Sequence, residues 1–240
     1  MAFGAALREL RRAQKTTKGV SLYSRHINRP AGRVLAAAAY RIGMTPNQVT
    51  LISAAFSGAA VVLLACVQPS LLLGLAVYTG LAVGFAFDSA DGQLARLRRE
   101  SSAVGEWLDH VVDCAKITAL HAAVLISFYR FFQLPSPNWL LLPLGFQFAT
   151  VLIFFGGLLT DKLKPKVGGG TVASLGAAPS RLRALVLLPV DYGTFCTIFL
   201  LLGNERAFLV GYAVLFAVHV LFLAGFMAKW FRELAAIRTM

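Results

Sequence analysis

Apolar residues occur along this chain in long, nearly uninterrupted runs. A run of about 20 apolar residues can span a bilayer as a helix. Six runs approach that length: Val49–Val67, Leu71–Phe87, Val111–Phe128, Trp139–Thr160, Ala184–Leu202 and Ala207–Ala228. Backbone groups in lipid must find their hydrogen bonds within the segment, so helices are expected throughout. The pattern predicts an all-α integral membrane protein with six transmembrane helices.

The segment before the first run divides into two parts. Residues 1–20 are polar and basic with little periodicity, and are predicted to form a mobile tail. Residues 21–45 are predicted to hold a short amphipathic helix at the membrane interface, with Pro30 in its first turn and Gly43 at its end. A solvated helix is the alternative. Residues 46–240 would form one six-helix transmembrane domain, in which the Gly- and Lys-rich stretch 162–183 is expected to be a mobile loop.

Composition and charge support this interpretation. Only 14% of the residues are charged, against about 25% in soluble domains. Twenty Lys and Arg residues lie in the termini and the loops on the same side, and two lie in the opposite loops. By the positive-inside rule, both termini are cytoplasmic. The net charge of +12 is spread over that one face, which indicates attraction to anionic lipid headgroups and not nucleic acid binding.

Acidic residues are few, and most of them gather in one place. Six of the eleven lie between Asp88 and Asp113, at the ends of the second and third runs. Asp88 and Asp91 are three residues apart and Asp109 and Asp113 are four apart, so each pair lies on one helix face. Two antiparallel helices would point all four carboxylates into a common cleft. Ionisable groups cost several kcal/mol in a bilayer, so the cluster indicates function.

The cluster has the chemistry of a metal site. Four carboxylates repel one another unless a cation lies between them, and hard oxygen ligands suit Mg²⁺, Mn²⁺ or Ca²⁺, singly or as a binuclear pair. Zinc is disfavoured because no Cys or His completes the cluster. Gly92 and Ala95 are small enough for a bulky ligand to approach, and Arg96 follows on roughly the same face, where it suits a phosphate. The combination indicates phosphoryl-group chemistry at a membrane surface.

These residues carry a resemblance. The stretch DSADGQLARLRRESSAVGEWLDHVVD fits D-x-x-D-G-x-x-A-R-x(8)-G-x-x-x-D-x-x-x-D at all eight fixed positions over 26 residues. It resembles the signature of the CDP-alcohol phosphotransferase (CDP-alcohol phosphatidyltransferase) family, whose members make phospholipids from CDP-linked donors. Pro46-Asn47-x-x-Thr50 resembles a second element of that family, at the start of its first span.

The resemblance implies a role for each matching residue. The implied metal ligands are Asp88, Asp91, Asp109 and Asp113, holding Mg²⁺ or Mn²⁺ in a binuclear site. The implied contacts to CDP are Asn47, Thr50, Gly92, Ala95 and Arg96. Asp113 would also act as the general base that takes a proton from the acceptor hydroxyl. The hydroxyl would attack the β-phosphorus of the donor and release CMP.

Three more residues are candidates for an acceptor site. Lys116, one turn beyond Asp113, is expected either to contact a substrate phosphate or to offset the aspartates. Asp191 lies inside the fifth run, where a lone carboxylate is costly, so an acceptor or ion-pair role is expected. Arg181 belongs to the basic loop before that run. His110 flanks the motif but is expected to face another helical direction, with an indirect or surface role.

Several functions compete. The favoured one transfers the phosphatidyl group of CDP-diacylglycerol to a small polar alcohol, such as glycerol phosphate, inositol phosphate or serine. The alternative passes a CDP-activated headgroup to a lipid alcohol. A small cation transporter and an inactive membrane scaffold are the rivals from other classes. The transporter is disfavoured because the carboxylates gather at one membrane face.

The expected partners follow from the same resemblance. They are a CDP-linked lipid or alcohol, membrane lipids, and a second copy of the chain in a homodimer. The protein is expected to be a multi-pass membrane protein with its active site on the cytoplasmic side, in the cell membrane if the source is bacterial.

Overall fold

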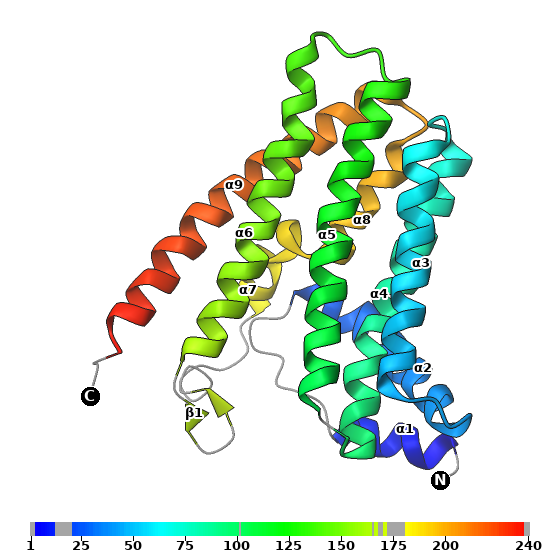
Figure 1. Cartoon of the computed structure of the whole chain (residues 1–240), viewed down its shortest axis with the longest axis vertical. Coiled ribbons are helices and arrows are strands. Elements are labelled where there is room, and N and C mark those ends of the chain that lie inside the picture. The colour runs from blue at the N-terminus through cyan, green and yellow to red at the C-terminus, as the bar shows by residue number, and fades with distance from the viewer. Residues whose placement is uncertain are drawn as a thin grey trace.

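The computed structural model describes residues 3–12, 21–100, 102–164, 166–167, 170–171 and 181–237. Five long helices cross the molecule: α3 (Pro46–Cys66), α4 (Leu71–Arg98), α5 (Ala103–Phe131), α6 (Leu141–Leu163) and α9 (Glu205–Ala235). Each is long and apolar enough to cross a membrane, α6 together with the 3₁₀ turn η2 (Pro137–Leu140) that precedes it. Helices α3 to α6 run alternately up and down (Figure 1). The predicted all-helical, membrane-type architecture is therefore confirmed.

The fifth predicted span is not a single straight helix. It consists of α7 (Arg181–Val186), η4 (Leu188–Val190), α8 (Tyr192–Cys196) and η5 (Thr197–Leu201), and its two halves meet at 46°. Pro189 has no amide hydrogen to continue a helix. Asp191 is extended, and its carboxylate accepts hydrogen bonds from the amides of Gly193 and Thr194, which starts α8. The described residues thus contain five candidate spans, or six if the bent pair counts as one.

The N-terminal region is more ordered than the sequence suggested. A helix, α1 (Phe3–Arg12), replaces the predicted mobile tail over these residues, while residues 13–20 lie outside the described part. Ala6 and Leu10, one turn apart, are buried in a small apolar cluster where α1 contacts α2 (Arg29–Arg41) and α4. The sequence did not reveal this face because two buried positions among basic residues make a weak pattern. The helix expected within residues 21–45 is present as the π-helical turn η1 (Ser24–Asn28) followed by α2.

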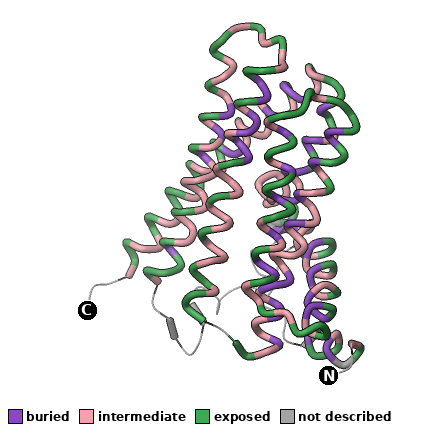
Figure 2. The backbone as a smooth tube through the Cα atoms, turned by 45° about the vertical axis from the view of Figure 1, so that its right-hand side comes forward, coloured by how far each residue is buried: buried purple, intermediate pink, exposed green. Residues whose placement is uncertain are grey.

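The larger part of the core lies among the long helices and the broken fifth segment. Its centre is aromatic: Phe128, Phe146, Phe195, Phe208 and Tyr212 are all at most 5% exposed. Figure 2 shows that buried positions gather where helices face one another, while outward positions are exposed. Leu72 and Leu221 are among the large apolar side chains left open to the outside. An apolar outer surface is expected of a protein surrounded by lipid.

A close helix crossing near the motif joins α3 to α4. The hydroxyl of Ser53 donates a hydrogen bond of 2.8 Å to the backbone carbonyl of Gly84. A Cβ atom at Gly84 would overlap the hydroxyl of Ser57 and lie 3.1 Å from the carbonyl of Ser53. Gly84 is one turn before Asp88, so this contact sets the position of the first motif aspartate against α3.

The Gly- and Lys-rich stretch after α6 is described only in part. Two short strands, β1 (Lys166–Val167) and β2 (Gly170–Thr171), pair in antiparallel fashion. The mobility predicted for residues 162–183 falls largely on positions outside the described residues.

Candidate active site

The motif is carried by two antiparallel helices that extend beyond the apolar runs. The predicted second span ended at Phe87, but α4 continues to Arg98, so Asp88 and Asp91 lie on a continuous helix. The helix ends at Arg99, which adopts the left-handed conformation with φ of 58°. Ser102 then caps α5 by accepting a hydrogen bond of 3.0 Å from the amide of Gly105. The short connection brings both aspartate pairs to the same end of the bundle.

A cavity of about 770 Å³ opens among the first turn of α3, the end of α4 and the start of α5. Seven of the residues predicted from the motifs line it: Asn47, Thr50, Asp91, Gly92, Ala95, Arg96 and Asp109. The structure therefore brings together on three helices the residues that the resemblance implied for CDP, along with two of the implied metal ligands. Asp88 and Asp113 are one turn farther into their spans and are not among the lining residues.

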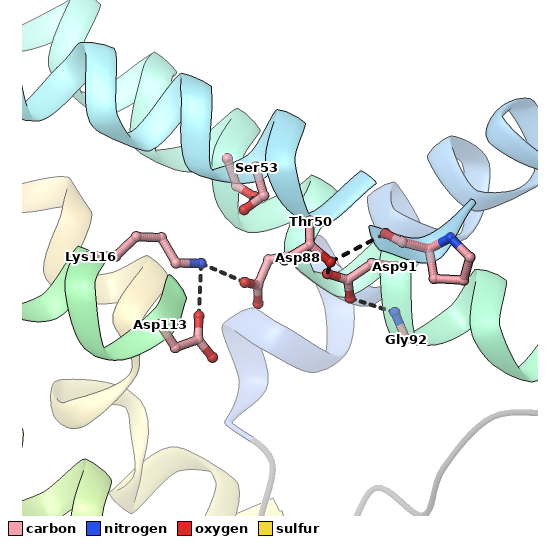
Figure 3. A network of polar contacts seen from close by, with 9 residues as sticks. Thr50, Ser53, Asp88, Asp91, Gly92, Asp113 and Lys116 are labelled. Carbon is pink, nitrogen blue, oxygen red and sulfur yellow. Dashed lines mark hydrogen bonds and ion pairs between the residues drawn. The ribbon is translucent and has the colours of Figure 1, made fainter. Parts of the chain in front are cut away.

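Lys116 lies between those two deeper aspartates, as Figure 3 shows. Its Nζ is 2.5 Å from Oδ1 of Asp88 and 2.8 Å from Oδ1 of Asp113. The lysine side chain is only 10% exposed. Lys116 thus pairs with both deeper aspartates, and its contact with a substrate phosphate stays a prediction.

Thr50 positions Asp91. Its hydroxyl donates to Oδ2 of Asp91 at 2.6 Å, and Oδ1 of the same carboxylate accepts from the amide of Gly92 at 2.5 Å (Figure 3). Thr50 is 3% exposed, so its hydroxyl is directed at the aspartate although the residue borders the cavity. Local sequence explains the placement, because Thr45 and Gln48 form a capping box that starts α3 at Pro46.

Asn47 faces the start of α5. A Cβ atom at Gly105 would lie 3.2 Å from Oδ1 of Asn47, tighter than an ordinary contact. The motif glycine therefore allows α5 to approach the first turn of α3. Asn47 and Gly105 both line the cavity, so this approach forms part of its wall.

A divalent cation has a suitable set of ligands here. Asp109, His110 and Asp113 each offer one ligand atom, and these atoms all lie within 4.8 Å of one another. His110 was expected to face another direction, and the structure corrects this: it lines the cavity, with Nε2 3.9 Å from Oε1 of Glu106. His110 is not a fixed position of the motif, so its place next to Asp109 was the only feature of the sequence that pointed to it. Carboxylate oxygens still dominate the set, which fits Mg²⁺ or Mn²⁺.

Positive charge lies beside the cavity. The side-chain amide of Gln93 donates to the backbone carbonyl of Arg29 at 3.1 Å, which ties α2 to α4 one turn before Arg96. Burial lowers the pKa of Arg29, and the charge of Arg25 lowers it further. Arg29 is also close enough to Arg96 for their charges to repel. An anion bound between two guanidinium groups would relieve this repulsion, so the arrangement favours the binding of an anion.

Of the two remaining acceptor candidates, Asp191 is not among the residues that line the cavity. Asp191 accepts hydrogen bonds from the hydroxyls of Ser21 and Ser24, the latter at 2.7 Å, and caps α8 with its other oxygen. Its carboxylate is thus satisfied by hydrogen bonds that join η1 to the broken segment. Arg181 begins α7, but its side chain lies outside the described part.

This arrangement is that of a membrane enzyme that handles a phosphate-bearing substrate. The model of the CDP-alcohol phosphatidyltransferase family matches residues 43–224, and the chain belongs to that family. It is therefore a phospholipid-synthesis transferase by class. No curated protein sequence is significantly similar to it.

Solved structures share its fold. Phosphatidylinositol phosphate synthase (PgsA1) of Mycobacterium tuberculosis with CDP-DAG bound is 20% identical, with a TM-score of 0.59, over 89% of this chain and 98% of that one. The same enzyme in complex with manganese and citrate is 19% identical, with a TM-score of 0.61, over 89% and 93%. At such identities the likeness concerns the fold.

Proposed function

We propose that this enzyme transfers the phosphatidyl group of CDP-diacylglycerol to a small polar alcohol, with release of CMP and dependence on Mg²⁺ or Mn²⁺. The observation that carries the proposal is the cavity, on which the family's motif residues from α3, α4 and α5 converge. CDP-diacylglycerol is favoured as the donor because a relative of the same fold was solved with CDP-DAG bound. A small anionic alcohol is favoured as the acceptor because Arg29 lies close enough to Arg96 to add positive charge beside the cavity.

Asp88, Asp91, Asp109 and Asp113 would hold the metal, with Thr50 fixing the orientation of Asp91. Asp109 and Asp113 offer ligand atoms close enough together to share one ion. When bound, the cation would neutralise the diphosphate and the charge that develops on leaving CMP. Gly92 and Ala95 leave room for the nucleotide against α4, and the Arg96 guanidinium would bind a phosphate oxygen.

Asp113 would act as the general base. The acceptor oxygen forms a bond to the β-phosphorus while the bond from that phosphorus to the CMP oxygen breaks. The proton of the acceptor hydroxyl passes to Asp113. Lys116 holds one oxygen of this carboxylate and so fixes the direction of the side chain. A positioned base of this kind contributes about 10²–10⁴-fold to a rate.

We also propose that the active site faces the cytoplasm, that α2 lies at the membrane interface, and that the protein is a homodimer. The positive-inside bias supports the first. The motif end of α4 lies at the same end of the molecule as α1 and the C-terminal end of α9 (Figure 1), which fits basic termini on one side. Exposed Val34 on α2 and exposed Ile42 just after its end support the second. The homodimer rests on family resemblance.

The test is CMP release from CDP-diacylglycerol by purified protein with Mg²⁺ or Mn²⁺, across a panel of alcohols. Release should depend on one acceptor, be abolished by EDTA, and fall by at least 10²-fold in Asp113→Asn. Asp161→Asn is the matched control, because Asp161 is exposed near the end of α6 and does not line the cavity. Release only from a CDP-linked headgroup with a lipid alcohol would replace the proposal with the alternative reaction. No release from any pair would refute both.

A further inference from the structure

A cavity that the motif residues do not line lies between α7 and the segment that contains η1. Its volume is about 370 Å³, and it is lined by Leu22, Arg25, His26 and Leu185. Ligand sites in proteins commonly have volumes of about 300–1,000 Å³. This cavity and the cavity of the motif share no lining residue within the described part of the chain.

The wall formed by η1 is basic. Among the described residues, no carboxylate lies within ion-pairing distance of Arg25. Arg29 follows one turn later, close enough that the charge of Arg25 lowers its pKa. The exposed imidazole of His26 can donate a hydrogen bond beside Arg25. A phosphate suits this wall, because a guanidinium group binds two phosphate oxygens at once and an anion would relieve the repulsion between the arginines.

The rest of the wall is apolar. Leu22 and Leu185 line the cavity from the two segments that enclose it. Ile27 on η1 and Leu182 on α7 are both more than half-exposed. Apolar side chains beside basic ones are typical of elements at a membrane interface, where headgroups and acyl chains meet. A phospholipid would contact both parts of the wall, whereas a free phosphate would contact only the basic part.

We propose that this cavity binds one anionic phospholipid from the surrounding leaflet, with its phosphate against Arg25 and His26 and its acyl chains along Leu22 and Leu185. The site uses the interfacial position proposed for α2, but it is independent of the transfer reaction.

A lipid bound there would hold two distant segments together. Ser21 and Ser24 already join this N-terminal segment to Asp191 of the broken fifth span. The lipid would add a contact to α7, the other half of that span. Within the described part of the chain, no hydrogen bond or ion pair joins α7 to η1 directly.

The test counts retained lipid and does not depend on activity. Protein purified in detergent is stripped of lipid and mixed with equal amounts of phosphatidylglycerol and phosphatidylcholine that carry the same acyl chains. EDTA is present throughout, so that no lipid phosphate binds through a metal at the motif. Bound lipid is then counted by native mass spectrometry. Wild type should retain one phosphatidylglycerol in preference to phosphatidylcholine.

Two arginine variants separate a built site from general attraction to the basic surface. Arg25→Gln should lower the affinity for phosphatidylglycerol by about tenfold or more, because charge-assisted hydrogen bonds to the phosphate are lost. Arg41→Gln is the matched control, since Arg41 is exposed at the other end of α2 and carries the same charge. It should lower the affinity by at most about fivefold, the effect of one basic residue near an anionic surface. Equal losses in the two variants would overturn the proposal.

A third variant tests the cavity itself. Leu22→Trp fills part of the cavity without changing the charge, and it should reduce retention of phosphatidylglycerol about as much as Arg25→Gln. A folded Leu22→Trp protein that retains the lipid as the wild type does would overturn the proposal. Equal retention of the two lipids by the wild type would do the same. Displacement of the lipid by inorganic phosphate at equal concentration would show instead that the site takes a free phosphate.

Discussion

A methyl group at Gly84 is expected to force α3 and α4 apart where they cross near the motif. The Cβ of Gly84→Ala would overlap the hydroxyl of Ser57 and crowd the backbone of Ser53. The neighbouring atoms belong partly to backbone, so they cannot all rotate away. The helices must separate, and the hydrogen bond from Ser53 to the Gly84 carbonyl must lengthen or break.

The size of the effect follows from three contributions. Overpacking a core costs about 1–3 kcal/mol. Loss of the hydrogen bond adds about 0.5–1.5 kcal/mol. The better helix propensity of alanine returns about 1 kcal/mol. The free energy of unfolding should therefore fall by about 1–3 kcal/mol.

Gly58→Ala is the matched control, since nothing lies within 4 Å of a Cβ atom at that position on α3. It should gain up to about 1 kcal/mol from propensity alone. The free energies of unfolding can be compared by titrating SDS into mixed micelles and following tryptophan fluorescence. If Gly84→Ala is as stable as Gly58→Ala, the close crossing of α3 and α4 is wrong.

Two further predictions concern hydrogen bonds that the site depends on. Thr50→Val should weaken Mn²⁺ binding by roughly 10–100-fold because Asp91 loses the donor that orients it. Thr50→Ser, which keeps a hydroxyl, should retain the affinity for Mn²⁺. Loss of CDP binding with unchanged Mn²⁺ affinity would show instead that Thr50 contacts the nucleotide. Asp191→Ala should lower the free energy of unfolding by about 2–4 kcal/mol, since a helix cap is lost and the hydroxyls of Ser21 and Ser24 lose their acceptor. Hydrogen exchange at residues 21–28 should then accelerate, and unchanged exchange would contradict this role.

The sequence was sufficient for those features that depend on local periodicity. Pairs of aspartates three and four residues apart had to share a helix face, and the short polar connection between two apolar runs had to bring the two helices together antiparallel. The structure places Asp91 and Asp109 on one cavity for this reason. The long helices were predictable on the same grounds, because composition over about 20 residues decides whether a segment crosses a bilayer.

Features that depend on contacts between distant segments could not be predicted. Apolar composition made the fifth span look continuous, because the serines that satisfy Asp191 lie in another part of the chain. The ion pair between Lys116 and Asp88 could not be predicted, because the spacing of Lys116 from Asp113 does not show that a carboxylate on another helix also contacts its ammonium. The hydrogen bond from Thr50 to Asp91 joins two helices and could not be predicted either, while the contact of Thr50 with the nucleotide stays a prediction.

The bond between Ser21 and Asp191 has a consequence for how the protein is made. The two residues are 170 positions apart, so the ribosome must produce most of the chain before they can meet. Until then the carboxylate that begins α8 lacks these hydroxyl partners, although its bonds to the amides of Gly193 and Thr194 can already form. The segment around Ser21, made early in translation, can therefore dock onto the broken segment only after that segment has been made.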